Sequence, residues 1–218
     1  MTTEKLSTAA ETLTASTLGS TPVWRRVNEL TDLVEIFDPE VQICSWQRQL
    51  DPAIAQYLCG LELNRKLQAL ETLVPTDPPE IGALPEHPGK TALLDDLALL
   101  RDILCELLGS EAAGMRLARL GHAMCPGWHV DKVGIRLVCT YQGPGTQWLE
   151  DQNVDRGQLR SEQVRNGRAV EATPGEIVLL KGAIWQGNQG YGAIHRSPEL
   201  TVNAPLRTLV TLDPFWRE

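Results

Sequence analysis

Short segments in which apolar and polar residues alternate, separated by Gly, Pro and Asn, make up the second half of the chain. Alternation with a period of two is typical of half-buried β-strands, and strands this short and closely spaced indicate a sandwich or a barrel. The predicted strands cover residues 115–120, 133–141, 146–149, 169–172, 177–181, 193–195 and 207–212. We therefore expect a β-barrel or jelly roll in this half.

Helical periodicity precedes these strands. Between Thr91, which we expect to cap a helix, and Gly109, which we expect to end it, apolar residues form one stripe. They are Leu93, Leu94, Leu97, Leu100, Ile103, Leu104, Leu107 and Leu108. Such a stripe is typical of a helix packed on a core, so we assign it no chemistry.

The rest of the first half is less regular. An Asp-Pro pair at position 51 predicts the start of a helix over residues 52–73, in which Gly60 is a weak point. Residues 34–37 and 41–44 look like two short strands with a turn between them.

These patterns divide the chain into three regions. Residues 1–20 are polar and predict a disordered tail, residues 21–110 predict a mainly helical part, and residues 111–218 predict the β core. The expected fold class is α+β, with N-terminal helices packed on that core.

Composition excludes several classes of partner. The 218 residues carry 20 basic and 28 acidic side chains, a formal net charge of -8, and the charges are interspersed. Nucleic acid and anionic membranes are therefore poor partners, and no apolar run approaches the ~18 residues of a transmembrane helix. Five scattered cysteines without a CxxC pair, in a chain without a signal-peptide pattern, are expected to be reduced. We expect a cytoplasmic protein whose substrate is a small molecule or stays unknown; its oligomeric state stays open.

The first candidate for chemistry is the pair His129 and Asp131. Two residues apart on a strand, an imidazole and a carboxylate project to one face, where they can chelate one divalent ion. The residues Val133, Ile135, Leu137, Cys139 and Tyr141 are expected to share that face. The alternative is a His–Asp hydrogen bond at a strand end, because this short motif also arises by chance.

Residues further along the chain favour the metal. His195 lies at the end of a predicted strand, and Arg207 opens the final strand. The order H-x-D, distal His, then a basic residue resembles that of the double-stranded β-helix oxygenases, which depend on Fe(II) and 2-oxoglutarate. The resemblance implies that His129, Asp131 and His195 bind the metal on one face and that Arg207 binds the distal carboxylate of 2-oxoglutarate. It also implies a double-stranded β-helix (jelly-roll or cupin-like) core, and no catalytic residue beyond the metal site.

Two features depart from the oxygenase pattern. Leu209 stands where several subfamilies have Ser or Thr, and Lys132 directly follows the carboxylate ligand, with which it could form a salt bridge. The second contact to 2-oxoglutarate is open, and Tyr141 and Arg136 are the candidates. Glu171 and Glu176 stay open as internal partners for Arg207.

A closer resemblance is to an uncharacterised bacterial family, a domain of unknown function. It rests on the strings HVDK at 129–132, GPGT at 143–146 and HRSP at 195–198. The resemblance implies no established activity. Members of the family are encoded near zinc-homeostasis genes, which implies zinc as an alternative ion. The second hypothesis is therefore a non-catalytic zinc-binding or metal-homeostasis protein on the same fold.

Several residues near the motif have two interpretations. Trp128, Lys132 and Arg196 could face a substrate, whereas core packing and ordinary salt bridges are the simpler alternatives. Cys125 and Cys139 could join a zinc site, but buried free thiols are the favoured interpretation.

Overall fold

The computed structural model describes residues 23–61, 67–75, 77–149, 154–161, 164 and 169–216. The predicted tail over residues 1–20 lies outside them. The strands are β1 (Val23–Val27), β2 (Val41–Trp46), β3 (Gln68–Leu73), β4 (Ala112–Leu120), β5 (Ile135–Gln142), β6 (Gln147–Trp148), β7 (Val170–Glu171), β8 (Ile177–Lys181), β9 (His195–Arg196) and β10 (Arg207–Phe215). The helices are α1 (Pro52–Gly60) and α2 (Lys90–Leu108), with 3-10 turns η1 (Leu30–Phe37) and η3 (Arg156–Gln158).

The strands form two sheets. The larger has the order β1-β2-β8-β5-β10-β4-β3, and the smaller has the order β7-β6-β9, to which His129 adds a bridge beside His195. From β4 to β10 the chain passes between the two sheets: β4, β5, β8 and β10 lie in the larger one, and His129, β6, β7 and β9 in the smaller one. This winding is that of a double-stranded β-helix. The predicted α+β class and β-helix core are confirmed.

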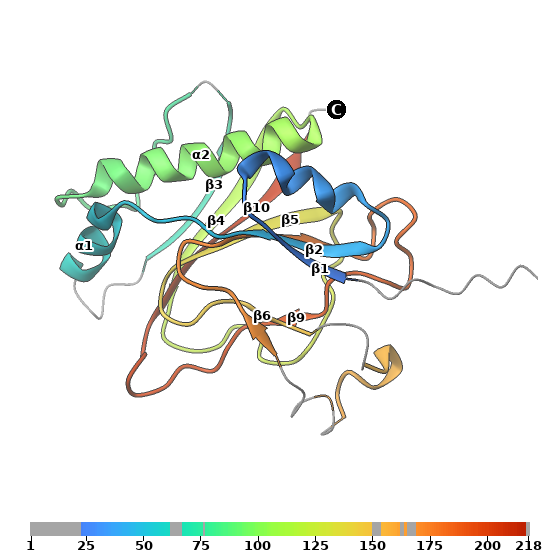
Figure 1. The fold of residues 1–218 in the computed structure, drawn as a ribbon. Helices are drawn as coiled ribbons and strands as arrows, with labels where there is room; N and C mark the ends of the chain where they lie inside the picture. Colours follow the sequence, from blue (N-terminus) through green and yellow to red (C-terminus); the bar gives the residue numbers. More distant parts are fainter. Residues whose placement is uncertain are drawn as a thin grey trace, which may run out of the picture.

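Two apolar layers lie on the two faces of the larger sheet. Helix α2 covers one face, and the smaller sheet lies on the other side (Figure 1). Under α2, the leucine stripe packs on strand residues such as Leu117, Leu137 and Val210. Between the sheets, Val138 and Leu209 pack against the fully buried Trp148. Neighbouring residues of a strand therefore contribute to different layers, and only the layer between the sheets reaches the candidate site.

Of the two predicted ends of α2, only the C-terminal end agrees with the structure. Gly109 ends the helix in the left-handed region, with φ 62°, where a residue without Cβ is favoured. The N-cap is Gly89 and not Thr91, and no side chain caps the helix there. Most of the stripe is buried, and Leu94, Leu107 and Leu108 are partly buried against the same core.

Two predictions for the first half are wrong. The helix that starts after Asp51 ends at Gly60, and Gln68–Leu73 forms strand β3, which pairs with β4. The pairing outweighs the helical propensity of this segment. Residues 34–37 belong to the 3-10 turn η1, in which Leu33 and Ile36 are buried three residues apart. The region 21–110 thus also adds β1, β2 and β3 to the larger sheet.

Candidate metal centre

Strand pairing brings the two candidate histidines together. His129 and His195 exchange both backbone hydrogen bonds of an antiparallel bridge, with N–O distances of 3.1 and 3.0 Å. Residues paired in this way present their side chains on the same face of the sheet. The two imidazole rings accordingly lie with their centroids 4.4 Å apart.

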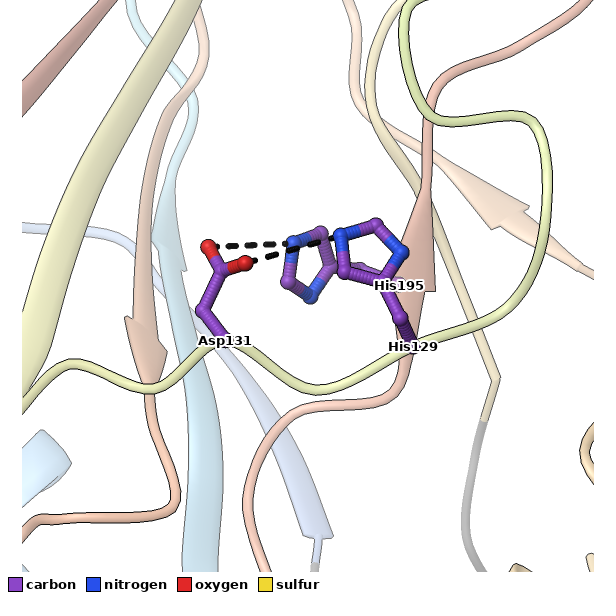
Figure 2. Close-up of side chains that lie close together, drawn as sticks. All are labelled: His129, Asp131 and His195. Carbon is purple, nitrogen blue, oxygen red and sulfur yellow. Dashed lines mark ion pairs between the residues drawn. The ribbon is translucent and has the colours of Figure 1, made fainter.

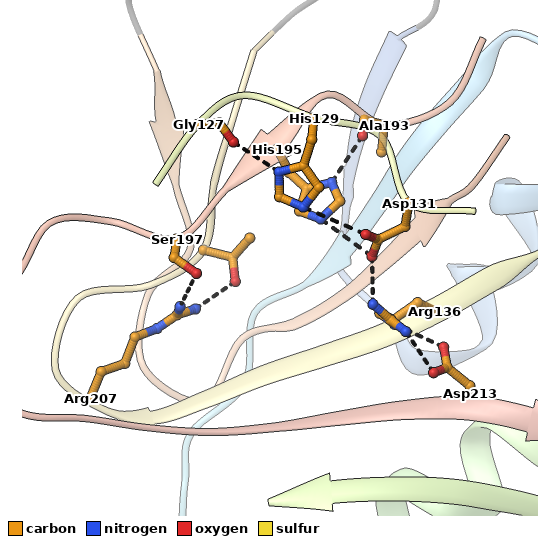
Figure 3. A network of polar contacts seen from close by, with 10 residues as sticks. Gly127, His129, Asp131, Arg136, Ala193, His195, Ser197, Arg207 and Asp213 are labelled. Carbon is orange, nitrogen blue, oxygen red and sulfur yellow. Dashed lines mark hydrogen bonds and ion pairs between the residues drawn. The ribbon is translucent and has the colours of Figure 1, made fainter. Parts of the chain in front are cut away.

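Backbone carbonyls orient both rings in the same sense. Nδ1 of His129 lies 2.9 Å from the carbonyl oxygen of Gly127, and Nδ1 of His195 lies 2.9 Å from that of Ala193 (Figure 3). A neutral ring that donates its Nδ1 proton to a carbonyl presents an unprotonated Nε2. The hydrogen bond between Nδ1 and the backbone carbonyl therefore fixes the tautomer in which Nε2 can bind a metal.

The carboxylate of Asp131 faces both Nε2 atoms. Its two oxygens lie 3.5 Å from Nε2 of His129 and 3.5 Å from Nε2 of His195 (Figure 2). One ligand atom from each residue lies within 4.8 Å of the others. The centre is accessible from outside, since the His129 side chain is 33% exposed.

The donor set fits a divalent first-row metal. Two imidazole nitrogens and one carboxylate, all on one side of a common point, are the ligands of a facial triad with open positions. The fit rests on the orientation of the rings and of the carboxylate. The three residues are the only cluster of this kind in the described part of the chain.

The ion pair between Arg136 and Asp213 holds the Asp131 carboxylate in position. Arg136 donates from Nη1 to Asp131 at 2.6 Å, and from Nε and Nη2 to the two oxygens of Asp213 at 2.8 and 2.7 Å (Figure 3). Asp213 holds the guanidinium in a two-pronged contact, so the remaining nitrogen is fixed on Asp131. Arg136 thus contacts two carboxylates, and one of them belongs to a candidate metal ligand.

These contacts set the protonation of the centre. Burial raises the pKa of Asp131, but hydrogen bonds to His129 and His195 and the charge of Arg136 outweigh burial and hold that pKa well below its usual range. The hydrogen bond to Asp131 in turn raises the pKa of His129. Asp131 is therefore an ionised candidate ligand at neutral pH.

Arg207 lies inside the barrel on hydroxyl groups. It is 2% exposed, and its Nη atoms contact the side chains of Thr146 at 2.7 Å, Thr140 at 3.2 Å and Ser197 at 3.4 Å. Its Nε is buried without a partner, and burial lowers the pKa of Arg207 to about 10. Ser197 lies two residues after His195, so the guanidinium adjoins the segment that carries a candidate ligand.

No carboxylate in the described residues contacts this guanidinium. Glu171 accepts instead from Gln147 at 2.7 Å, and Glu176 accepts from Thr173 and pairs with Arg26. A buried cation without an anionic partner among the described residues is costly, and an anionic ligand would lower that cost.

Tyr141 does not reach this site, and its prediction as a contact to 2-oxoglutarate is wrong. Its hydroxyl donates to Asp96 at 2.7 Å, beneath α2, where Asp96 also pairs with Arg48. Strand pairing is interrupted between Asp131 and Ile135. The side chains that face the barrel interior have odd residue numbers before this interruption and even residue numbers after it. Arg136, Val138 and Thr140 therefore face the barrel interior in place of the odd-numbered residues expected there.

The other residues singled out from the sequence lie around the centre. Lys132 is exposed, and the ion pairs of Asp131 in the described residues involve His129, His195 and Arg136 instead. Arg196 stacks on Trp128, with its guanidinium carbon 4.2 Å from the ring centroid. Cys125 and Cys139 are free thiols, exposed and buried respectively, and neither joins the cluster.

Four residues of the site were not singled out from the sequence. Three hydroxyl residues hold Arg207, and Asp213 holds Arg136; the set is Thr140, Thr146, Ser197 and Asp213. Asp213 could be recognised only from its position opposite Arg136 on the paired strands β5 and β10, and this position depends on the strand register.

The part of the chain that the structure describes contains no helix long and apolar enough to cross a membrane.

Comparison with known proteins gives one family match. A family model described as "Protein of unknown function (DUF1826)" matches residues 28–213. No curated protein matches the sequence.

Solved structures give several likenesses at low identity. A Pseudomonas putida prolyl-4-hydroxylase is 14% identical, over 87% of this chain and 100% of that chain, with a TM-score of 0.45. The Arabidopsis thaliana dioxygenase for auxin oxidation 1, in complex with 2-oxoglutarate, is 10% identical over 91% and 93%, with a TM-score of 0.46. A bsmA homolog from Methylobium petroleophilum is 13% identical over 88% and 94%, with a TM-score of 0.47.

Proposed function

The chain belongs to the DUF1826 family, and we propose that it is a mononuclear non-haem oxygenase that uses Fe(II) and 2-oxoglutarate. The observation that carries the proposal is Arg207, a buried guanidinium inside the barrel with no carboxylate partner in the described residues. A metal-handling protein has no need of such a cation, whereas a dicarboxylate co-substrate supplies the missing charge.

Each residue of the centre has a defined task in this proposal. His129, Asp131 and His195 would hold the iron, which supplies the site where O₂ and 2-oxoglutarate react. Arg207 would bind the distal carboxylate of 2-oxoglutarate, and the hydroxyls on its Nη atoms keep the guanidinium in position. Asp213, through Arg136, would keep the Asp131 carboxylate oriented toward the two Nε2 atoms.

An anaerobic titration tests the proposal. 2-Oxoglutarate is added to Fe(II)-loaded protein, and the metal-to-ligand charge-transfer absorbance is followed. We expect a saturable signal for the wild type, about tenfold weaker binding for Arg207→Lys, which keeps the charge but loses the planar fork, and no binding for Arg207→Ala. The exposed Arg25 provides the matched control, and Arg25→Lys should bind like the wild type.

Two results would contradict the proposal. One is the absence of any saturable signal in the wild type; the other is equal binding by wild type, Arg207→Lys and Arg207→Ala. Tight zinc binding combined with either result would make the zinc-binding hypothesis the better account.

A further inference from the structure

A groove opens on the inner face of the larger sheet, at the end where β4 and β3 lie. Its volume is about 680 Å³, within the range of small-molecule sites. One end is lined by Arg136, which contacts the candidate ligand Asp131 at 2.6 Å. The groove therefore starts one side chain away from the candidate metal centre.

Strand alternation decides which side chains face the groove. On β4, Met115 and Leu117 point into the layer under α2, so Arg116 and Ala118 point the other way. The strand register places Arg116 between Leu70 of β3 and Thr211 of β10. The lining thus combines apolar and hydroxyl side chains with the guanidinium groups of Arg116 and Arg136 and the carboxylates of Glu71 and Asp213.

Leu70 is an apolar side chain that the fold leaves exposed. It is 67% exposed on β3, while its neighbours Ala69 and Leu73 are buried under α2. Together with Ala118 and Leu209 it gives the groove an aliphatic wall. A wall of this kind suits an apolar substrate body.

Arg116 brings a positive charge that forms no ion pair with the described residues. Its one described hydrogen bond runs from Nη2 to the thioether sulfur of Met124 at 3.0 Å, and its Nε is buried without a partner. A thioether is a weak acceptor and carries no charge. Asp213, which also lines the groove, has both oxygens on Arg136.

A second cavity beside the centre lacks this feature. It has a volume of about 950 Å³ and is lined in part by His129, Trp128 and Arg196. Arg196 is already stacked on Trp128 and donates to Gln147 at 2.8 Å, and Arg160, the other arginine there, also has a partner. The arginines of this cavity thus have other partners, whereas Arg116 contacts only the thioether sulfur of Met124 among the described residues.

We propose that the groove between Arg136 and Leu70 is the substrate site, and that Arg116 binds the carboxylate of a substrate with an aliphatic body. The inference rests on the proposed function, because it makes this groove the place from which a substrate meets the iron. The guanidinium supplies a charge-assisted contact to the anionic end, and the aliphatic wall excludes water from the rest.

Hexanoate and its neutral counterpart hexanamide are the probes for this site. Each is titrated into metal-free ¹⁵N-labelled protein and then into the Arg207→Met variant, and backbone amide shifts are followed. We expect saturable shifts on β4 and β10 around Arg116 with hexanoate, and about tenfold weaker binding of hexanamide. Arg116→Gln should weaken hexanoate binding about tenfold, Arg116→Lys should restore part of it, and the exposed control Arg25→Gln should change nothing.

The outcomes separate the groove from the proposed function. Equal binding of the two probes, unchanged binding by Arg116→Gln, or shifts confined to the surroundings of Arg207 or Arg196 would overturn the substrate site. Hexanoate binding retained in Arg207→Met supports a site distinct from the co-substrate pocket. If hexanoate binds at Arg116 while 2-oxoglutarate fails to bind Fe(II)-loaded protein, the carboxylate site stands and the oxygenase proposal falls.

Discussion

Replacing Arg207 by methionine should stabilise the ligand-free protein while abolishing its response to 2-oxoglutarate. Burial lowers the pKa of Arg207 from the usual value of a guanidinium to about 10. Since one pKa unit corresponds to about 1.4 kcal/mol, the charge costs the folded state roughly 3 kcal/mol. The penalty is present at neutral pH, because both states are charged below pH 10, and it is relieved only as the pH rises through that value.

The substitution also removes favourable contacts. Thr140 and Thr146 lose their hydrogen bonds to the guanidinium, and each buried hydroxyl left without a partner costs about 1 kcal/mol. Methionine has a similar length and fills the space with an apolar chain. The balance is a gain of about 1 kcal/mol, or a rise in Tm of about 2–4 °C for a chain of this length.

Thermal unfolding with and without 2-oxoglutarate provides the assay, with Mn(II) as a metal that does not turn over. The wild type should gain about 2.7 kcal/mol at a ligand concentration of about 100 times Kd, and Arg207→Met should gain nothing. The exposed control Arg25→Met should keep the wild-type response. A loss of more than about 2 kcal/mol in ligand-free Arg207→Met, or an undiminished response to 2-oxoglutarate, would show that Arg207 is a structural residue.

Three further predictions concern the centre and its surroundings. His129→Ala and His195→Ala should each abolish metal retention, measured by elemental analysis after gel filtration, with the far-UV circular dichroism unchanged; full metal content in either variant would refute the triad. Tyr141→Phe should lower the free energy of unfolding, measured in urea, by about 1.5–3 kcal/mol, because the hydrogen bond to the Asp96 carboxylate is lost. The Kd for 2-oxoglutarate should not change. Weaker binding of 2-oxoglutarate at unchanged stability would show that Tyr141 belongs to the site after all. Because Asp131 raises the pKa of His129, the protonated pair stabilises the ligand-free protein at low pH, and this contribution is lost as the pH rises through the raised pKa. Metal affinity should therefore fall as the pH is lowered through that pKa; an affinity that does not change from neutral to mildly acidic pH would contradict the assignment.

The triad could be predicted because its signals are local and chemical. His129 and Asp131 lie two residues apart, and His195 lies at the end of a predicted strand. The structure brings these three side chains together. Arg207 also lies inside the barrel, and Glu171 and Glu176, the two acidic residues left open as its partners, form their described contacts with other groups.

The rest of the site depends on features that periodicity does not contain. The alternation from His129 to Tyr141 looks unbroken in the sequence, but the chain leaves the strand before Ile135, which reverses the inward face. The pairing of Arg136 with Asp213 depends on the register between β5 and β10, two segments far apart in the chain.

The first half shows the same limit in its secondary structure. Residues 68–73 contain good helix-forming side chains, but the free edge of β4 takes them up as a strand. In η1 the spacing of Leu33 and Ile36 fits a helical turn, although the residue types around them favour a strand. In both segments tertiary packing outweighs local propensity.

A crystal structure of protein loaded anaerobically with Fe(II) and 2-oxoglutarate tests the central claim most directly. Anomalous scattering at the iron edge locates the metal independently of the ligand density. The account predicts an iron peak bound by Nε2 of His129, Nε2 of His195 and the carboxylate of Asp131, with 2-oxoglutarate on the iron and its distal carboxylate on Arg207. An iron peak at any other group, or a 2-oxoglutarate molecule that leaves Arg207 without a carboxylate, would contradict it.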